Sequence, residues 1–144
     1  MFSQDRGALR QTFIDTWDKA RSGAPMEPLE SRLGGIIEQH PEYQPLLAAG
    51  DDVLDRDWLP EHGESNPFLH MALHMTVLEQ VQTDRPPGIR KLYQQAVRNA
   101  LGDAHAAEHE LMTCLAEMIW QVYQDGQEPN LKRYLKCIKR QLRD

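Results

Sequence analysis

Apolar residues recur along most of the chain at intervals of three and four, the spacing of one face of an α-helix. The first clear case is the series Leu9, Phe13 and Trp17, in which each residue follows the last by four positions. The sequence shows no convincing run of alternating apolar and polar residues, the pattern that a half-buried strand produces. The pattern therefore predicts an all-α fold.

Residues that favour helix ends divide this pattern into about six helices with short connections. Ser3, Asn66 and Asp103 are good N-terminal capping residues, Asn130 starts the last helix, and Gly23 and Gly126 are good helix-ending residues. The predicted helices cover about residues 4–22, 28–40, 67–83, 89–101, 104–125 and 130–144, with at most a short turn of helix over 43–47. This arrangement predicts a helical bundle.

The length of the chain, 144 residues, suits one compact domain, so we expect a single helical domain over residues 1–144. No stretch approaches the roughly 20 apolar residues that span a bilayer, which excludes a membrane partner. The first residues lack the apolar core of a secretory signal, so we expect a cytoplasmic protein. In that reducing compartment, the two cysteines Cys114 and Cys137 should be free thiols.

Charge is unevenly distributed along the chain. The net charge of −6 disfavours a nucleic-acid-binding protein, yet the last predicted helix, at about residues 130–144, is strongly basic. Its cationic residues are Lys132, Arg133, Lys136, Lys139, Arg140 and Arg143. Such a stripe is most often a solvated face, but it also suits an acidic partner or the chain's own acidic surface. The sequence leaves a homo-oligomer open.

Acidic residues gather at about residues 48–65, between glycines and prolines that predict a loop. Asp55 and Asp57 have the spacing of a calcium-binding loop. The glycine that such a loop needs at its sixth position is replaced by Pro60, which disfavours calcium. We therefore expect a solvated acidic loop.

Four of the six histidines form two pairs with a spacing of four residues: His70 with His74, and His105 with His109. This spacing places both imidazoles of a pair on one helix face, about 40° apart. Two helices that present such pairs to each other can supply four nitrogen ligands. Neutral imidazole is a ligand for zinc, iron, copper and nickel.

The residues around these histidines indicate which side chains are buried and add a carboxylate to the predicted metal ligands. His70 and His74 lie on a helix that is apolar almost all round, so we expect them to be buried with partners for both ring nitrogens. Glu108 falls within the apolar face of its helix, where a carboxylate is costly unless it meets a metal, an imidazolium, an arginine or backbone donors. The predicted metal ligands are His70, His74, His105, Glu108 and His109. Zinc or iron is the expected ion, and Glu108 is the candidate general base.

Several segments resemble a bacterial family, domain of unknown function family 1841. They are Asn66–His74 (NPFLHMALH), Glu79-Gln80, Asp84-Arg85-Pro86, Gly88-Ile89, His105–His109, Phe2–Trp17 and His40–Tyr43. The resemblance covers almost the whole chain and includes the same four histidines. The family has no assigned activity. The resemblance therefore implies which family the chain belongs to, but it does not imply a reaction.

Two functions of different classes remain open. The first is the binding of a transition-metal ion by the paired histidines, with no reaction or substrate identified. The second is a non-catalytic interaction module, in which the histidines only hydrogen-bond within the bundle and the basic helix docks on an acidic protein or nucleic acid. His40 and His62 are interpreted as a helix-end cation and a loop residue.

Overall fold

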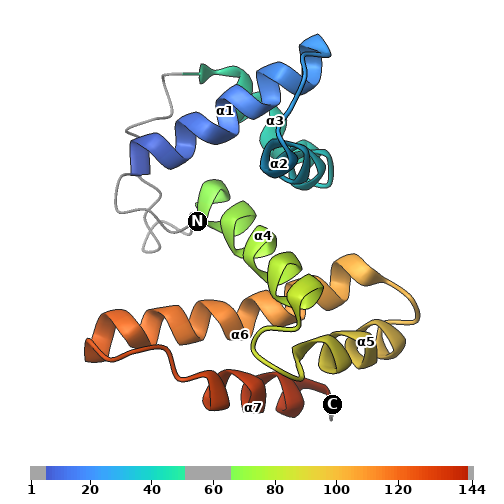
Figure 1. Ribbon diagram of the computed structural model, residues 1–144, viewed down its shortest axis with the longest axis vertical. Helices are drawn as coiled ribbons and strands as arrows, with labels where there is room; N and C mark the ends of the chain where they lie inside the picture. Colours follow the sequence, from blue (N-terminus) through green and yellow to red (C-terminus); the bar gives the residue numbers. More distant parts are fainter. Residues whose placement is uncertain (1–5, 51–65, 143–144) are drawn as a thin grey trace. The chain divides into compact units, whose positions relative to one another are not determined.

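The computed structural model describes residues 6–50 and 66–142, and in these ranges it contains α-helices, one short 3-10 helix and no β-strand (Figure 1). The elements are α1 (Arg6–Ser22), α2 (Pro28–Glu38), η1 (Pro41–Tyr43), α3 (Gln44–Ala48), α4 (Pro67–Thr83), α5 (Ile89–Asn99), α6 (Ala104–Asp125) and α7 (Leu131–Leu142). The predicted all-α fold is confirmed. The short turn of helix expected over 43–47 is α3, which brings the α-helices in the described ranges to seven. The predicted acidic loop, with Asp55 and Asp57, lies almost entirely outside the described residues.

The predicted caps Asn66 and Asp103 both cap their helices, and so does Asn130, the predicted start of the last helix; the predicted cap Ser3 lies outside the described residues. The side-chain oxygen of Asn66 accepts hydrogen bonds from the backbone N–H groups of Phe68 (2.9 Å) and Leu69 (3.2 Å). Asp103 accepts from the N–H of Ala106 at 3.1 Å, and Asn130 accepts from the N–H of Arg133 at 3.0 Å. These bonds satisfy donors that have no partner within a helix, which explains why the sequence marks these starts clearly.

The end of α5 differs from the prediction. The helix stops at Asn99 rather than near Leu101. Leu101 has a φ of 56° and Gly102 a φ of 89°, so the chain turns through two left-handed residues before α6. Leucine rarely adopts this conformation, and no sequence rule places it there.

The chain divides into two compact units, residues 1–75 and 76–144, and each is described by itself. The first contains α1, α2, η1, α3 and the first half of α4, with α1 packed against α2 and α3. The rings of Phe13 and Phe68 lie 5.9 Å apart in its core. Its other buried apolar side chains include Ile14, Leu33, Ile36, Ile37, Leu47 and Met71. The single-domain organisation stays a prediction.

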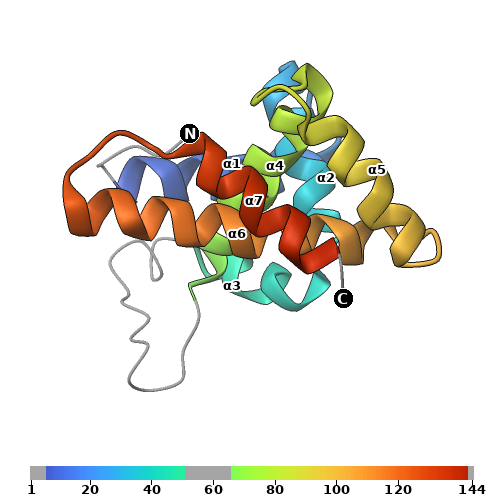
Figure 2. The same ribbon diagram turned by 90° about the horizontal axis from the view of Figure 1, so that it is seen from below.

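The second unit contains the end of α4 together with α5, α6 and α7. Helix α6 packs against both α5 and α7, and α7 runs alongside α6 in both views (Figure 1 and Figure 2). Its buried side chains include Ile89, Ala96, Leu111, Leu115, Tyr134 and Ile138. The Tyr134 hydroxyl donates a 2.7 Å hydrogen bond to Gln80 Oε1, which fixes α7 to the end of α4, and burial raises the pKa of Tyr134.

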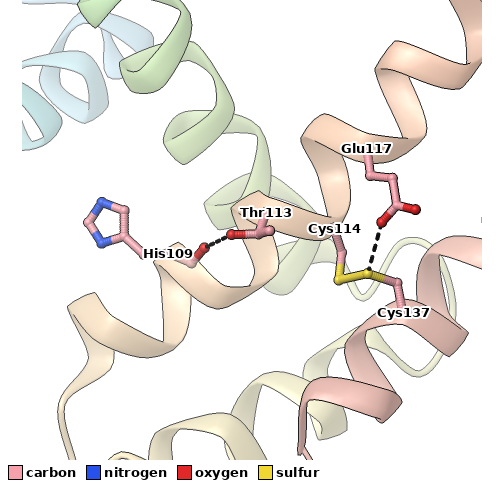
Figure 3. The surroundings of a disulfide bond; sticks show 5 residues. All are labelled: His109, Thr113, Cys114, Glu117 and Cys137. Atoms are coloured by element: carbon pink, nitrogen blue, oxygen red, sulfur yellow. Dashed lines mark hydrogen bonds between the residues drawn. A yellow bond between two sulfur atoms is a disulfide. The ribbon is translucent and has the colours of Figure 1, made fainter. Parts of the chain in front are cut away.

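A disulfide joins the two cysteines, so the prediction of free thiols is wrong. Cys114 of α6 and Cys137 of α7 are bonded, with their Cα atoms 5.8 Å apart (Figure 3). The prediction rested on the number of cysteines and on the expected compartment. Neither the number of cysteines nor the compartment indicates that α7 packs on α6. This packing brings the two cysteines to the separation that a disulfide requires.

Within the described ranges, the chain has no helix that combines the length and the apolar character needed to cross a membrane.

Candidate functional site

Three imidazoles form a cluster in the first unit, here called the first cluster: His40, His70 and His74. His40 follows α2, whereas His70 and His74 lie one turn apart on α4. The ring centroid of His40 is 4.9 Å from that of His70 and 5.3 Å from that of His74, both in edge-on contact. One ring nitrogen of His40 and one of His70 lie within 4.8 Å of each other. His40 and His70 therefore place two nitrogen donors at a spacing that suits a shared ligand, and the His74 ring lies beside them.

Burial distinguishes the members of the first cluster. His74 is 0% exposed and His40 is 2% exposed, while His70 is half-buried. The burial of His74 agrees with the apolar surroundings that the sequence predicts. His40 lies at the end of α2, as expected, but its side chain is buried and contacts the rings of His70 and His74, which the sequence analysis did not predict. The sequence does contain a sign of this burial. His40 follows Leu33 by seven residues and Ile36 by four, so it extends the apolar face of the helix that contains them.

The hydrogen bond of His40 defines which ring nitrogen carries a proton. Its Nδ1 lies 2.8 Å from the carbonyl oxygen of Ile36. A carbonyl can only accept, so Nδ1 is the protonated nitrogen, and the neutral ring carries its lone pair on Nε2. Metal-ligating histidines use this same arrangement, in which a backbone carbonyl orients the ring through the nitrogen that does not bind the metal.

The aromatic ring of Tyr43 packs against two imidazoles of the first cluster. Its ring stacks parallel to that of His40 at 5.3 Å and meets the ring of His70 edge-on at 5.8 Å. Burial, with a smaller contribution from Glu42, raises the pKa of Tyr43, so its hydroxyl is protonated at neutral pH. Tyr43 therefore orients the imidazoles as a neutral ring rather than as a phenolate ligand.

The second cluster lies in the second unit, at the start of α6, and consists of His105, Glu108 and His109. The rings of His105 and His109 are 4.1 Å apart, and a nitrogen of His105 lies within 4.8 Å of a carboxylate oxygen of Glu108. His109 Nδ1 is 2.9 Å from the carbonyl oxygen of His105, which leaves the lone pair of the neutral ring on Nε2. The three predicted residues thus share one helix face, as their spacing requires.

Glu108 is the buried member of the second cluster, with only 6% of its surface exposed, whereas His105 is exposed. The hydroxyl of Tyr93, on α5, donates a 2.8 Å hydrogen bond to Glu108 Oε2. The compensating donor is thus a side-chain hydroxyl, a kind of partner that the sequence analysis did not name. Burial, together with this bond, raises the pKa of Tyr93 to about 12, so the hydroxyl remains a donor at all ordinary pH values. A carboxylate accepts several bonds, so the Tyr93 contact is compatible with a further ligand role.

The predicted basic surface lies on one face of α7, whose opposite face buries Tyr134, Ile138 and Leu142. The exposed cationic side chains are Lys132, Arg133, Lys136, Lys139 and Arg140. Arg143 lies outside the described residues.

Within each unit the structure places His70 one turn before His74 on α4, and His105 beside both His109 and Glu108. It adds His40 and Tyr93, which the sequence did not single out as site residues.

Comparison with known proteins gives a family for the chain. No curated protein and no solved structure matches it. A family model described as "Domain of unknown function (DUF1841)" matches residues 5–140, a range that contains both clusters and agrees with the resemblance seen in the sequence. Since the match extends over nearly the whole sequence, the chain belongs to the DUF1841 family.

Proposed function

We propose that this protein binds a divalent transition-metal ion, zinc or iron, through the imidazoles of its two clusters, with Glu108 as an oxygen ligand. The single observation that carries the proposal is the first cluster, in which the ring of His40 lies within 5.3 Å of the rings of His70 and His74 although His40 and His74 are almost wholly buried. Two imidazolium rings at this distance would repel each other, whereas neutral rings at this distance suit a shared metal ion.

The donor set and its orientation support the same function. Imidazole nitrogen and carboxylate oxygen are the common ligands of zinc and iron sites. His40 and His109 each direct Nδ1 to a backbone carbonyl, which leaves Nε2 as the donor atom. The proposal is limited to metal binding. Glu108 is the residue that would serve as general base if the site also had a reaction.

The proposal includes a bacterial source and a cytoplasmic location. In the cytoplasm of most organisms a disulfide is usually transient and sensitive to redox conditions rather than permanent. The cytoplasmic location is tested by cell fractionation with labelling of free thiols at the moment of lysis.

Elemental analysis of untagged, dialysed protein tests metal binding directly. We expect near-stoichiometric zinc or iron in the wild type and its loss in His40→Ala and His74→Ala. His62→Ala is the control, because the sequence interprets His62 as a loop residue and not as a metal ligand. Circular dichroism of each variant checks that it is folded. The half-buried His70 offers a further variant, His70→Ala, which removes a donor with less risk to the fold.

The stoichiometry of metal tests the sequence prediction that both clusters bind the same ion. One ion per chain that is lost with His74→Ala and also with His109→Ala would support that prediction. Two ions, each lost with the variant of one cluster only, would replace it by two separate sites. Wild-type protein that stays metal-free after incubation with zinc or ferrous ions would overturn the proposed function.

A second candidate function is favoured by the five exposed cations on one face of α7. In this alternative the protein is a non-catalytic interaction module that docks on an acidic protein. Fluorescence anisotropy with a labelled polyglutamate peptide tests it, because electrostatic binding weakens with added salt and with Lys136→Ala and Arg140→Ala. Preference for a nucleic-acid oligomer over polyglutamate would instead indicate nucleic acid as the partner.

A further inference from the structure

A cleft of about 840 Å³ lies between α6, α7 and their connection in the second unit. Both cysteines of the disulfide line this cleft, together with residues such as Met118, Leu131 and Tyr134. No residue of either histidine cluster is among its lining residues. The cleft therefore exposes a disulfide that is separate from the proposed metal ligands.

The two cysteines of the disulfide differ in exposure. Cys137 is 8% exposed, whereas Cys114 is 1% exposed. Thiol–disulfide exchange proceeds by attack of a thiolate on one sulfur of a disulfide, and access helps to decide which sulfur is attacked. A small thiol in the cleft therefore meets Cys137 Sγ first, and Cys114 is the leaving sulfur.

Glu117 provides an acceptor for the reduced form of Cys137. Its carboxylate Oε2 points at Cys137 Sγ from a distance of 3.6 Å (Figure 3). A disulfide sulfur has no hydrogen, so in the oxidised protein this is a contact between sulfur and oxygen. After reduction, the Cys137 thiol has a hydrogen to donate to the same oxygen. The surroundings of Cys137 are thus suited to both redox states.

Charge in the cleft indicates the class of thiol. The lining carboxylates, Glu117, Asp125 and Glu128, outnumber the cations Lys132 and Arg133. Glu117 is in direct contact with the sulfur that is attacked. Its negative charge repels an anionic thiol and attracts one that carries an ammonium group.

We propose that the Cys114–Cys137 disulfide is a thiol–disulfide exchange site, reached through the cleft between α6 and α7 by small thiols with a cationic or neutral tail. A first thiolate bonds to Cys137 Sγ, the protein disulfide breaks, and Cys114 leaves as a thiolate. A second small thiolate then attacks the mixed disulfide, which releases the small disulfide and the Cys137 thiolate. The protein thiolates take up the two protons that the small thiols lost, so two small thiols are oxidised as the protein disulfide is reduced. A small disulfide reverses both steps.

The experiment uses the full chain in its oxidised form without denaturant. The protein is incubated with cysteamine, which carries an ammonium group, or with 3-mercaptopropionate, which carries a carboxylate. The mixture is then quenched by alkylation and mapped by peptide mass spectrometry. We expect the mixed disulfide on Cys137 at least about fivefold more often than on Cys114, because Cys137 is the accessible sulfur.

The Glu117→Gln variant tests the part of the proposal that concerns the cleft. We expect the ratio of the cysteamine rate to the 3-mercaptopropionate rate to fall about threefold, because one repulsive charge is removed beside the sulfur. Comparing the ratio between proteins removes the intrinsic difference in reactivity between the two thiols. Glu110→Gln is the matched control, since Glu110 is exposed on the same helix but does not line the cleft, and its ratio should equal that of the wild type.

Three results would overturn the proposal. The first is exchange that occurs only in denaturant, which would show that the disulfide is inaccessible. The second is an adduct found mainly on Cys114. The third is a rate ratio that Glu117→Gln leaves unchanged. Because mapping in the wild type needs no cysteine variant, the test does not depend on the folding of a protein that lacks the disulfide.

Discussion

The two histidine clusters place the same type of side chain in opposite surroundings. In the first cluster the rings come from two segments far apart in the sequence, and His40 and His74 are almost wholly removed from solvent. In the second, all members lie within five positions of one helix; His105 is exposed and only Glu108 is buried. The first cluster is therefore held by tertiary packing, whereas the geometry of one helix and the contact with Tyr93 hold the second.

The largest difference in stability between the clusters should appear when a buried histidine of the first and an exposed histidine of the second are each replaced by alanine. We expect His74→Ala to lower the free energy of unfolding by about 2–4 kcal/mol, because it leaves a cavity and removes a buried polar group. His105→Ala, at an exposed position, should change it by no more than about 0.5 kcal/mol. Urea unfolding of both variants in the presence of a chelator measures the effect of packing alone. Equal losses in the two variants would contradict the distinction.

Changes at Glu108 should have an intermediate effect, because this residue is the buried polar group of the second cluster. Glu108→Ala removes the acceptor of the Tyr93 hydroxyl, and we expect a loss of about 2 kcal/mol, as for a hydrogen bond to a charged group. Glu108→Gln retains an acceptor oxygen and should lose about 1 kcal/mol. The same unfolding assay checks both values. If Gln were as harmful as Ala, the charge of Glu108 rather than its hydrogen bond would be the important feature.

The smallest predicted loss of stability is that caused by replacing Tyr93. Tyr93→Phe should cost about 1 kcal/mol at neutral pH. In the folded protein the pKa of Tyr93 is raised from its ordinary value of 10 to about 12, so the protonated form is favoured by folding. The stabilisation is therefore complete below pH 10 and is lost as the pH rises towards 12.

The difference between wild type and Tyr93→Phe should accordingly be constant below pH 10 and decrease above it. Comparison with the variant is needed because the pKa values of Tyr43 and Tyr134 are also raised and contribute to the same alkaline loss. A difference that grows above pH 10 would refute the proposed role of the hydroxyl. Unfolding in urea at several pH values provides the measurement.

Much of the fold could be predicted because it depends on local rules. The caps at Asn66, Asp103 and Asn130 act within three residues of their own positions, so the sequence is sufficient to locate the starts of α4, α6 and α7. The second cluster was predictable for the same reason, since spacing along one helix decides which side chains share a face. The end of α5 was missed because it depends on the left-handed backbone of Leu101.

The features that the sequence did not reveal depend on contacts between elements. His40 was overlooked because its burial arises where the end of α2 meets the histidines of α4. The Tyr93 partner of Glu108 depends on the packing of α5 against α6, and the disulfide depends on the packing of α7 against α6. Periodicity shows which face of a helix is buried, but it does not identify the residue on the facing helix.

The disulfide also has a consequence for proteolysis. Cys114 and Cys137 close a ring of chain that includes the exposed connection at residues 126–130. A protease that cuts this connection leaves two polypeptides joined through sulfur, so the basic C-terminal fragment stays attached after its backbone is severed. Under denaturing conditions only reduction separates the two polypeptides. Denaturing electrophoresis of the cut protein without a reductant therefore gives one band for the oxidised form and two for the reduced form.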